Sequence, residues 1–180
     1  MKTVKLILPL LCLLAVACRD VPVVDVTPQK GDTLKENMIN ANRIIAQSEE
    51  QQIDAYLSRH GWKPERLTGG VRVSEMGNSE THLHHAIGYE DTVDIAYCVL
   101  TLGGDTLYNR REEEVVAGHL KPTRGLDAAL RTLHEGASAL VVVPSEQAYG
   151  VVGDGDRIRS RTVLVYQLEV LGVKPLEIRN

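Results

Sequence analysis

Three histidines form the densest group of side chains that could do metal chemistry. They lie within the segment Thr81-His-Leu-His-His85, and imidazole nitrogens suit zinc or copper. No cysteine or HExxH-type pair lies near this segment, which falls between two stretches of strand-like alternation. A metal site and a solvated loop are both open as interpretations, and the missing further ligands favour the loop.

The other polar side chains do not form a catalytic pattern. His60, His119 and His134 are isolated and have no nucleophile beside them. Asp154-Gly-Asp156 has the composition of a calcium loop but lacks the remaining ligands, so a tight turn is preferred. The chain contains no Phe, one Trp and six Tyr. Any pocket is therefore expected to be lined by aliphatic side chains and tyrosines.

The N-terminus resembles a bacterial lipoprotein signal. Lys2 and Lys5 precede an apolar run, 6–17, that is too short to span a bilayer as a helix. Small residues lead into Cys18, which in such signals is acylated and becomes the mature N-terminus. Ala15 departs from the leucine that is usual at its position, and an ordinary secretory signal with a chance cysteine is the alternative. The sequence thus predicts lipidation at Cys18 and attachment to the bacterial cell envelope, at the outer membrane or the periplasmic face.

The net charge and the cysteine content limit the expected partners and disulfide bonds. The formal net charge is −4, and loss of residues 1–17 removes two of the 20 basic and none of the 24 acidic side chains, which gives −6. A nucleic-acid-binding face needs basic residues to neutralise phosphates, so no nucleic acid is expected as a partner. Cys98 would be left without a second cysteine for an internal disulfide, and its alternating apolar surroundings predict a buried small side chain.

A tether and a long helix are expected before the main domain. Residues 18–31 contain two prolines and no periodicity, which is typical of a spacer. Residues 32–60 contain no Pro or Gly and carry apolar side chains at near-helical spacing, with Thr33 as a candidate N-cap. This amphipathic helix either packs on the domain behind it or pairs through 32–59 with a second copy as a homodimer. The pattern does not choose between the two.

The rest of the chain alternates like a sheet around one helix. Period-two patterns after Gly70 and over 93–99, an apolar run over 139–143 and a strong pattern over 162–171 predict strands. Residues 124–134 place apolar side chains on one face and predict a helix that ends before Gly136. The expected fold class is therefore α+β, with one antiparallel sheet wrapped around one short helix.

Two motifs in the second half carry a family resemblance. Pro144-Ser-Glu-Gln-Ala-Tyr-Gly150 is followed by Leu164-Val-Tyr-Gln-Leu-Glu-Val-Leu171, and Arg124-Gly-Leu126 opens the expected helix at the right distance before them. Over residues 67–174 the chain resembles the FKBP-type peptidyl-prolyl cis-trans isomerases. The resemblance implies an FKBP-like domain, an isomerase that acts on X-Pro peptide bonds, and a site that needs neither metal nor cofactor.

The resemblance also assigns site residues. Tyr97 matches a tyrosine of the pocket wall, Thr123 a backbone N–H donor, and Tyr149 a tyrosine whose hydroxyl bonds a substrate carbonyl; these three are the expected catalytic residues. The matched substrate pocket consists of Leu107, Tyr108, Pro122, Leu126, Ile158 and Tyr166.

Several of these positions depart from the family pattern. Leu107-Tyr108 stands where the family has Phe-Asp, so a pocket aromatic and a carboxylate are missing. Leu126 replaces the tryptophan that floors the cavity, which predicts a deeper and looser pocket without ring stacking. Glu113 falls near a further pocket phenylalanine. Arg157 and Arg159 occupy flap positions that are usually apolar or proline.

Two functions are therefore open. The first is a lipid-anchored FKBP-type isomerase that assists folding of exported, proline-containing polypeptide clients, with weak activity because of the altered pocket. The second is a non-catalytic module that binds or assembles part of a cell-envelope machine, as in the gliding-motility lipoproteins that the chain also resembles. The two differ in whether a cavity stays open under Tyr97, Tyr149 and Tyr166 or is filled by Tyr108.

Overall fold

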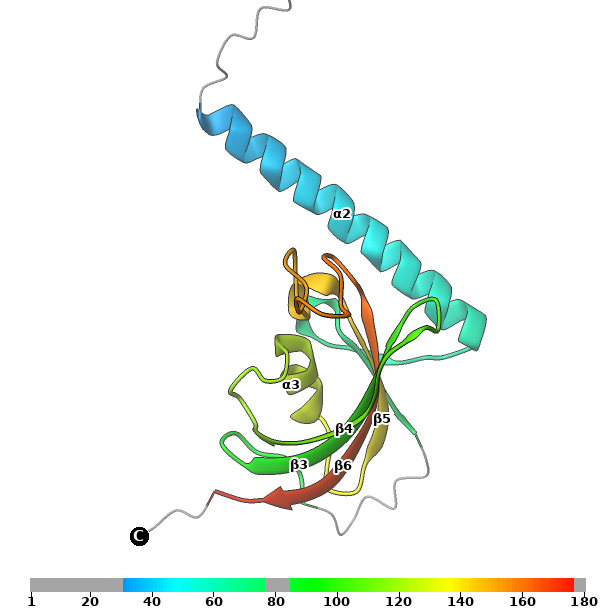
Figure 1. Ribbon diagram of the computed structural model, residues 1–180, viewed down its shortest axis with the longest axis vertical. Coiled ribbons are helices and arrows are strands. Elements are labelled where there is room, and N and C mark those ends of the chain that lie inside the picture. Colours follow the sequence, from blue (N-terminus) through cyan, green and yellow to red (C-terminus); the bar gives the residue numbers. More distant parts are fainter. Residues whose placement is uncertain (1–30, 77–84, 177–180) are drawn as a thin grey trace, which may run out of the picture. The chain divides into compact units, whose positions relative to one another are not determined.

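The computed structural model describes residues 31–76 and 85–176 (Figure 1). The chain divides into two compact units, residues 1–40 and 41–180, and each is considered by itself. The expected signal, the tether up to residue 30 and Cys18 lie outside the described residues, as do His82 and His84. The described strands and all the expected pocket residues belong to the second unit.

Six strands form one sheet in the order β1-β2-β5-β6-β3-β4, and all neighbouring strands are antiparallel. Their bounds are β1 Glu65–Arg66, β2 Arg72–Met76, β3 Thr92–Thr101, β4 Thr106–Val116, β5 Ser138–Val143 and β6 Leu164–Lys174. The sheet curves around the short helix α3 (Figure 1). The predicted α+β fold is confirmed.

Strand β5 lies between two apolar layers, because its side chains alternate between the two faces of the sheet. Ala139, Val141 and Val143 belong to the inner core around α3. Leu140 and Val142 belong to a second cluster on the outer face. The unbroken apolar run of this strand follows from burial on both sides.

Helix α3 extends over Arg124–Leu130 and presents Leu126, Ala129 and Leu130 to the inner core. Thr123 is its N-cap, and the Thr123 hydroxyl accepts a hydrogen bond of 3.2 Å from the N–H of Leu126. The helix ends four residues earlier than the predicted limit at residue 134. After Leu130 the backbone N–H groups of Thr132 and Leu133 bond three residues back, which is a tighter turn than an α-helix.

Helix α2 extends over Gly31–His60, so Thr33 lies inside its first turn and is not its cap. Its part in the second unit packs on the outer face of the sheet through Ile53, Tyr56 and Leu57, which share a cluster with residues of β5 and β6. Burial of a side chain such as Ile53 stabilises the fold by about 1.5–3 kcal/mol. This half of the helix therefore packs on its own domain. Pairing with a second copy stays a prediction.

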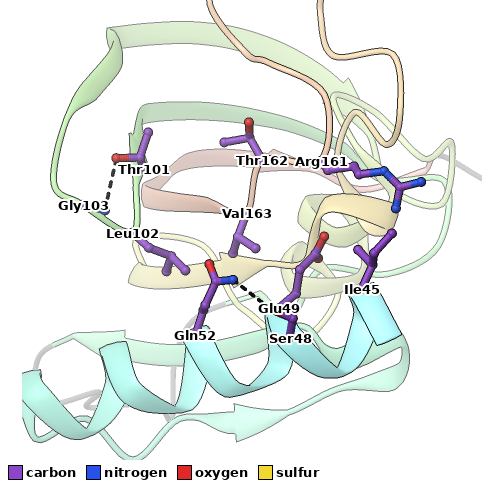
Figure 2. A pocket seen from close by; sticks show the side chains of 10 residues that line it. All are labelled: Ile45, Ser48, Glu49, Gln52, Thr101, Leu102, Gly103, Arg161, Thr162 and Val163. Atoms are coloured by element: carbon purple, nitrogen blue, oxygen red, sulfur yellow. Dashed lines mark hydrogen bonds between the residues drawn. The ribbon is translucent and has the colours of Figure 1, made fainter. Parts of the chain in front are cut away.

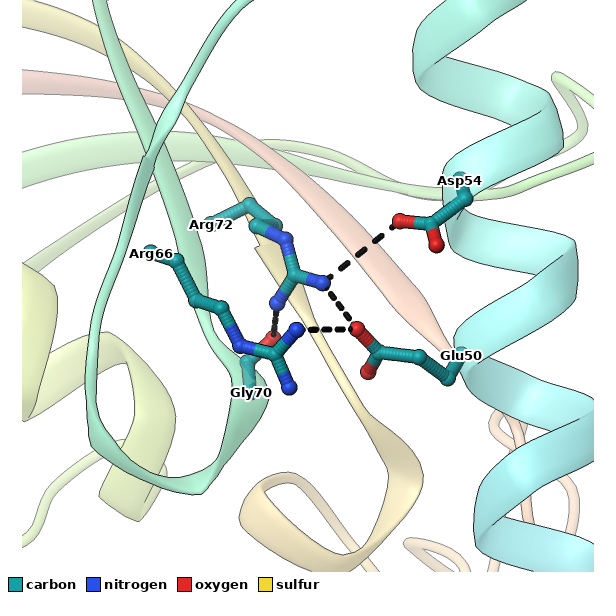
Figure 3. Close-up of polar contacts among 5 residues, drawn as sticks. All are labelled: Glu50, Asp54, Arg66, Gly70 and Arg72. Carbon is teal, nitrogen blue, oxygen red and sulfur yellow. Dashed lines mark hydrogen bonds and ion pairs between the residues drawn. The ribbon is translucent and has the colours of Figure 1, made fainter.

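Ion pairs also attach this part of α2 to the domain (Figure 3). Glu50 pairs with Arg66 at 2.6 Å and with Arg72, whose side chain is almost fully buried. Arg72 also donates to the carbonyl of Gly70 and lies 3.6 Å from the carboxylate of Asp54. A buried guanidinium needs several acceptors, and α2 supplies two of them.

Cys98 differs from its expected position. It is half-buried, because it lies on β3 between the inward-facing Tyr97 and Val99 and therefore faces outward. The alternation correctly predicted the strand, but the prediction of a buried cysteine was wrong.

Candidate functional site

The structure brings the predicted site residues together on the inner side of the sheet. Tyr97, Tyr108, Leu126, Ile158 and Tyr166 belong to one buried cluster, against which Leu107 and Tyr149 pack. Thr123 is buried at the start of α3, and Pro122 precedes it half-buried.

Tyr97 and Tyr166 face the same side because of the pairing of β3 with β6. Tyr97 lies opposite Leu168, and Tyr166 lies opposite Val99. The two rings meet edge to face, with centroids 5.7 Å apart and an interplanar angle of 61°. Such a contact adds to the apolar burial of both rings, and it fixes two walls of the site.

A bulge in the pairing of β3 with β4 determines the orientation of Tyr108. The register shifts between Tyr97 and Val99, which places Tyr108 opposite the inward-facing Val99. The Tyr108 ring is 8% exposed, and its hydroxyl donates to Asp154 and, at 3.2 Å, to Asp156. The guanidinium of Arg111 lies 3.7 Å from the ring centroid. Tyr108 is thus held between a charged loop and the inner core.

The segment Asp154-Gly-Asp156 forms a turn closed by the side chain of Asp154, as expected from the missing calcium ligands. One carboxylate oxygen of Asp154 accepts hydrogen bonds from the N–H groups of Asp156 at 2.9 Å and Ile158 at 2.8 Å. Burial alone would raise the pKa of Asp154, but the Tyr108 hydroxyl and these N–H groups outweigh it and hold the pKa below its usual value. The ionised form of Asp154 therefore positions both Tyr108 and Ile158.

Tyr97 is also bound to a carboxylate. Its hydroxyl donates to Glu113 at 2.9 Å. Burial first, and Glu113 second, raise the pKa of Tyr97 far above its usual value, so the hydroxyl keeps its proton. The sequence assigned Glu113 to the neighbourhood of a missing aromatic residue. Its carboxylate instead contacts Tyr97 and provides a negative charge beside it, where the resemblance had suggested that a carboxylate was lost.

Two hydrogen-bond donors of the site make no hydrogen bond to the described residues. Among the residues that the structure describes, neither the backbone N–H of Thr123 nor the hydroxyl of Tyr149 donates a hydrogen bond. Tyr149 is half-buried, and burial first, then Asp154 and Glu113, raise the pKa of its hydroxyl, which therefore stays protonated and able to donate.

The hydroxyl of Tyr166 is influenced by both Thr123 and Tyr149. Its pKa is raised mainly by burial, and its electrostatic neighbours are Tyr149, Thr123, Tyr97 and Glu113. No hydrogen bond of ordinary geometry reaches this hydroxyl within the described ranges, although the Thr123 hydroxyl, which accepts the N–H of Leu126, lies close enough to lower the pKa of Tyr166. Residues from β3, β4, the start of α3 and the 144–150 turn therefore influence the Tyr166 hydroxyl on β6.

Comparison with known proteins shows which family this part of the chain resembles. Residues 86–171 match the family model described as FKBP-type peptidyl-prolyl cis-trans isomerase. A curated protein of Pseudomonas aeruginosa PAO1, named probable FKBP-type 25 kDa peptidyl-prolyl cis-trans isomerase, is 35% identical over 108 residues. Residues 86–171 form an FKBP-type domain. The aligned part covers 60% of this chain and 46% of the relative, so the chain spans about half the length of that protein.

Solved structures support the fold of the FKBP-type domain. A peptidyl-prolyl cis-trans isomerase from Pseudomonas syringae pv. tomato DC3000 is similar with a TM-score of 0.55 and 22% identity, over 74% of this chain and 96% of that one. AtFKBP13 is similar with a TM-score of 0.54 and 15% identity, over 63% of this chain and all of that one. At these identities the likeness concerns the fold alone.

The floor of the FKBP-type domain differs from the expected loose pocket. Leu126 has no exposed surface, and Ile158 and Tyr166 are almost fully buried. Tyr108 belongs to the same buried cluster. The space that a smaller floor residue would leave is therefore covered in this conformation, and a proline ring needs a side-chain movement to reach Leu126.

Charged side chains at this site were assigned incompletely from the sequence. Arg157 lies 5.5 Å from the Tyr108 ring centroid and donates to the carbonyl of Leu107, so it covers the site, and Arg159 is exposed. The roles of Arg111 and Asp154 were not predicted. The contact of Arg111 with Tyr108 depends on the bulge, and the contact of Asp154 with Tyr108 depends on a turn distant in sequence. The Asp-Gly-Asp composition was the one available signal for the second.

Residues 31–76 and 85–176 contain no group of His, Cys, Asp and Glu side chains suited to a metal ion. Within the same ranges, no helix is long and apolar enough to cross a membrane.

Proposed function

We propose that the FKBP-type domain catalyses cis-trans isomerisation of X-Pro peptide bonds. The observation that carries this proposal is the pair of uncommitted donors, the Thr123 N–H and the Tyr149 hydroxyl, beside the buried rings of Tyr97 and Tyr166. Two donors next to an apolar surface suit a proline ring flanked by two carbonyl groups.

The reaction needs little more than such a surface. Rotation about the amide bond has a barrier of about 18–20 kcal/mol because the twisted bond loses its resonance. A site accelerates the rotation when it binds the twisted form more tightly than either planar form. In this proposal Thr123 and Tyr149 hold the carbonyl groups on either side of the twisting bond, and no nucleophile takes part.

We expect the activity to be weak. The aliphatic floor at Leu126 is completely buried, and Tyr108 is tied to Asp154 inside the same cluster. Part of the binding energy of a substrate would be used to move these side chains, which lowers kcat/KM.

The N-terminal sequence supports a proposal for the cellular setting. We propose that Cys18 is acylated and anchors the chain to the bacterial envelope, where it assists folding of exported proteins. Each methylene of an acyl chain contributes about 0.8 kcal/mol on burial in a bilayer, so two or three chains give a stable anchor. Mass spectrometry of the purified full-length protein would detect the acylated Cys18, and an unmodified chain with Met1 retained would contradict the anchor.

The second candidate is a non-catalytic FKBP-type module that binds or assembles envelope proteins. It is favoured by the same burial of Tyr108 and Leu126, since a filled cavity leaves no room for proline. Such a module could also pair through 32–59, where Leu34 and Met38 are exposed. The molar mass of residues 19–180 in solution tests the pairing, and a monomer at all concentrations would exclude it.

Refolding of a proline-limited protein distinguishes the two candidates. Its uncatalysed phase takes tens of seconds, so a modest acceleration is measurable. We expect residues 19–180 to accelerate this phase and Tyr149→Phe to lose most of the effect. No acceleration at stoichiometric protein would refute the enzymatic proposal and favour the binding module.

A further inference from the structure

A buried carboxylate on α2 contacts the segment that carries Tyr149. Glu49 is 8% exposed, and Figure 2 shows its side chain projecting from α2 toward the domain. One carboxylate oxygen accepts the N–H of Ser145 at 3.0 Å, and the other accepts the Ser145 hydroxyl at 2.5 Å. Both acceptor atoms of Glu49 are thus used by a single residue, 96 positions later in the chain.

The chemistry of Glu49 does not fit a purely packing role. Its neighbours on this face of α2 are Ile53, Tyr56 and Leu57, which belong to an apolar cluster. A carboxylate in such a place loses hydration, and the loss is tolerable only when hydrogen bonds replace it. An apolar side chain would serve packing better, so the benefit of Glu49 lies in what it does to Ser145.

Ser145 organises the turn that holds Tyr149. It is the first residue of the short helix η2, Ser145–Gln147. Its carbonyl accepts the N–H groups of Ala148 at 3.1 Å and Gly150 at 2.8 Å, the residues on either side of Tyr149. The position of Ser145 therefore determines where the Tyr149 backbone lies, and Glu49 fixes Ser145 from outside the turn.

We propose that Glu49 is a positioning residue for the Tyr149 hydroxyl, acting through Ser145. The N-terminal helix is then part of the catalytic apparatus of the FKBP-type domain as well as a connection to the rest of the chain. This inference rests on the proposed isomerase function and adds a residue outside the matched region 86–171.

Glu50 offers a matched control on the same helix. It pairs with Arg66 and Arg72, which belong to β1 and β2, and in the described part of the chain it makes no hydrogen bond or ion pair to residues 144–150. Glu50→Ala therefore weakens attachment of α2 without removing an acceptor from Ser145. A loss of activity that follows any loosening of the helix would appear in both variants, whereas a positioning role appears with Glu49→Ala alone.

The first experiment measures isomerase activity of residues 19–180 and its variants. We expect Glu49→Ala to lower kcat/KM about tenfold, less than the roughly hundredfold loss that a misplacement of 1 Å can cause. Glu50→Ala should change it less than twofold. In the Tyr149→Phe background, Glu49→Ala should have no further effect, because the hydroxyl that it positions is absent. Equal losses in the Glu49 and Glu50 variants, or a full tenfold loss in the Tyr149→Phe background, would overturn the proposal.

A second measurement does not depend on activity. Loss of the Glu49 carboxylate should speed amide hydrogen exchange at Ser145, Ala148 and Gly150, and Glu49→Gln, which retains an acceptor, should restore part of the protection. Unchanged exchange at these amides in Glu49→Ala would overturn the positioning role even if no isomerase activity is found. If Glu49→Ala does not fold, Ser145→Ala removes one of the two bonds and is expected to give a smaller effect of the same kind. Wild-type exchange at Ala148 and Gly150 in Ser145→Ala would then overturn the role.

Discussion

Removal of one oxygen atom from Tyr166 tests the site most directly. The Tyr166 ring is 1% exposed, and its hydroxyl makes no hydrogen bond of ordinary geometry within the described part of the chain, although Thr123 lies close enough to lower its pKa. A buried hydroxyl without a partner costs about 1–3 kcal/mol. Tyr166→Phe keeps the ring and its edge contact with Tyr97 but removes that cost.

We therefore expect Tyr166→Phe to raise the free energy of unfolding by about 1 kcal/mol, the lower end of the range for an unpaired buried hydroxyl. For a protein of this size that corresponds to a rise in Tm of about 2–4 °C. Tyr97→Phe is the matched control, because it breaks the bond to Glu113 and should instead destabilise by about 0.5–1.5 kcal/mol.

Urea unfolding of both variants at neutral pH measures the two effects, provided that the m-values are unchanged. A second check uses alkaline pH. Because the pKa of Tyr166 is raised in the folded state, titration of Tyr166 leaves the free energy of unfolding unchanged below about pH 10, the ordinary tyrosine value, and lowers it as the pH rises above that value. Tyr166→Phe should remove part of this alkaline loss. A Tyr166→Phe protein that is less stable than wild type by 1 kcal/mol or more would refute the reasoning, since the hydroxyl must then have a partner.

Two further predictions concern the loop ends and the floor of the site. Hydrogen bonds from the N–H groups of Gly88 and Leu176 lower the pKa of Asp91, so the stability it contributes is present above about pH 4 and is lost as the pH falls through its folded-state pKa. Asp91→Asn should flatten this acid loss in urea unfolding between pH 2 and 6, and an unchanged slope would argue against it. Leu126→Trp should raise isomerase activity while lowering stability by about 1–3 kcal/mol through overpacking; a stable variant without gain in activity would argue against a proline-binding cavity here.

The strands and the inner core could be predicted because buried apolar side chains recur in the sequence at every second position of a strand. Val93, Ile95, Tyr97 and Val99 alternate, and all four face the inner core. The run over 139–143 is apolar at each position since the second layer, formed with α2, covers the other face of β5. Cys98 lies between Tyr97 and Val99 in this alternation and therefore on the other face, where it is half-buried, so the prediction that it is buried was wrong.

The polar contacts of the site could not be predicted in the same way, because each joins residues far apart in the chain. Tyr108 and Asp154 are 46 positions apart, and Glu49 and Ser145 are 96 apart. The contact of Glu113 with Tyr97 depends on a bulge in β3 and β4 that has no periodic signal. The family resemblance supplied the identity of the pocket positions, but it could not supply partners that replace the family's own side chains.

The absence of Phe explains why these partners exist. A pocket built from tyrosines has the same apolar area as one built from phenylalanines, but each buried hydroxyl requires an acceptor or destabilises the fold. Glu113 satisfies Tyr97, and Asp154 satisfies Tyr108. The hydroxyls of Tyr97 and Tyr108 are therefore occupied by hydrogen bonds within the protein.

Tyr149 and Tyr166 are the pocket tyrosines whose hydroxyls make no such bond among the described residues, and they are electrostatic neighbours of each other beside Thr123. In a purely structural module, phenylalanine at position 166 would be the more stable choice. In the proposed function the Tyr149 hydroxyl bonds a substrate carbonyl, and the buried Tyr166 hydroxyl lies beside it. The free hydroxyl of Tyr149 therefore favours a site that binds substrate. The hydrogen bonds of Tyr97 and Tyr108 favour a site that opens only in part.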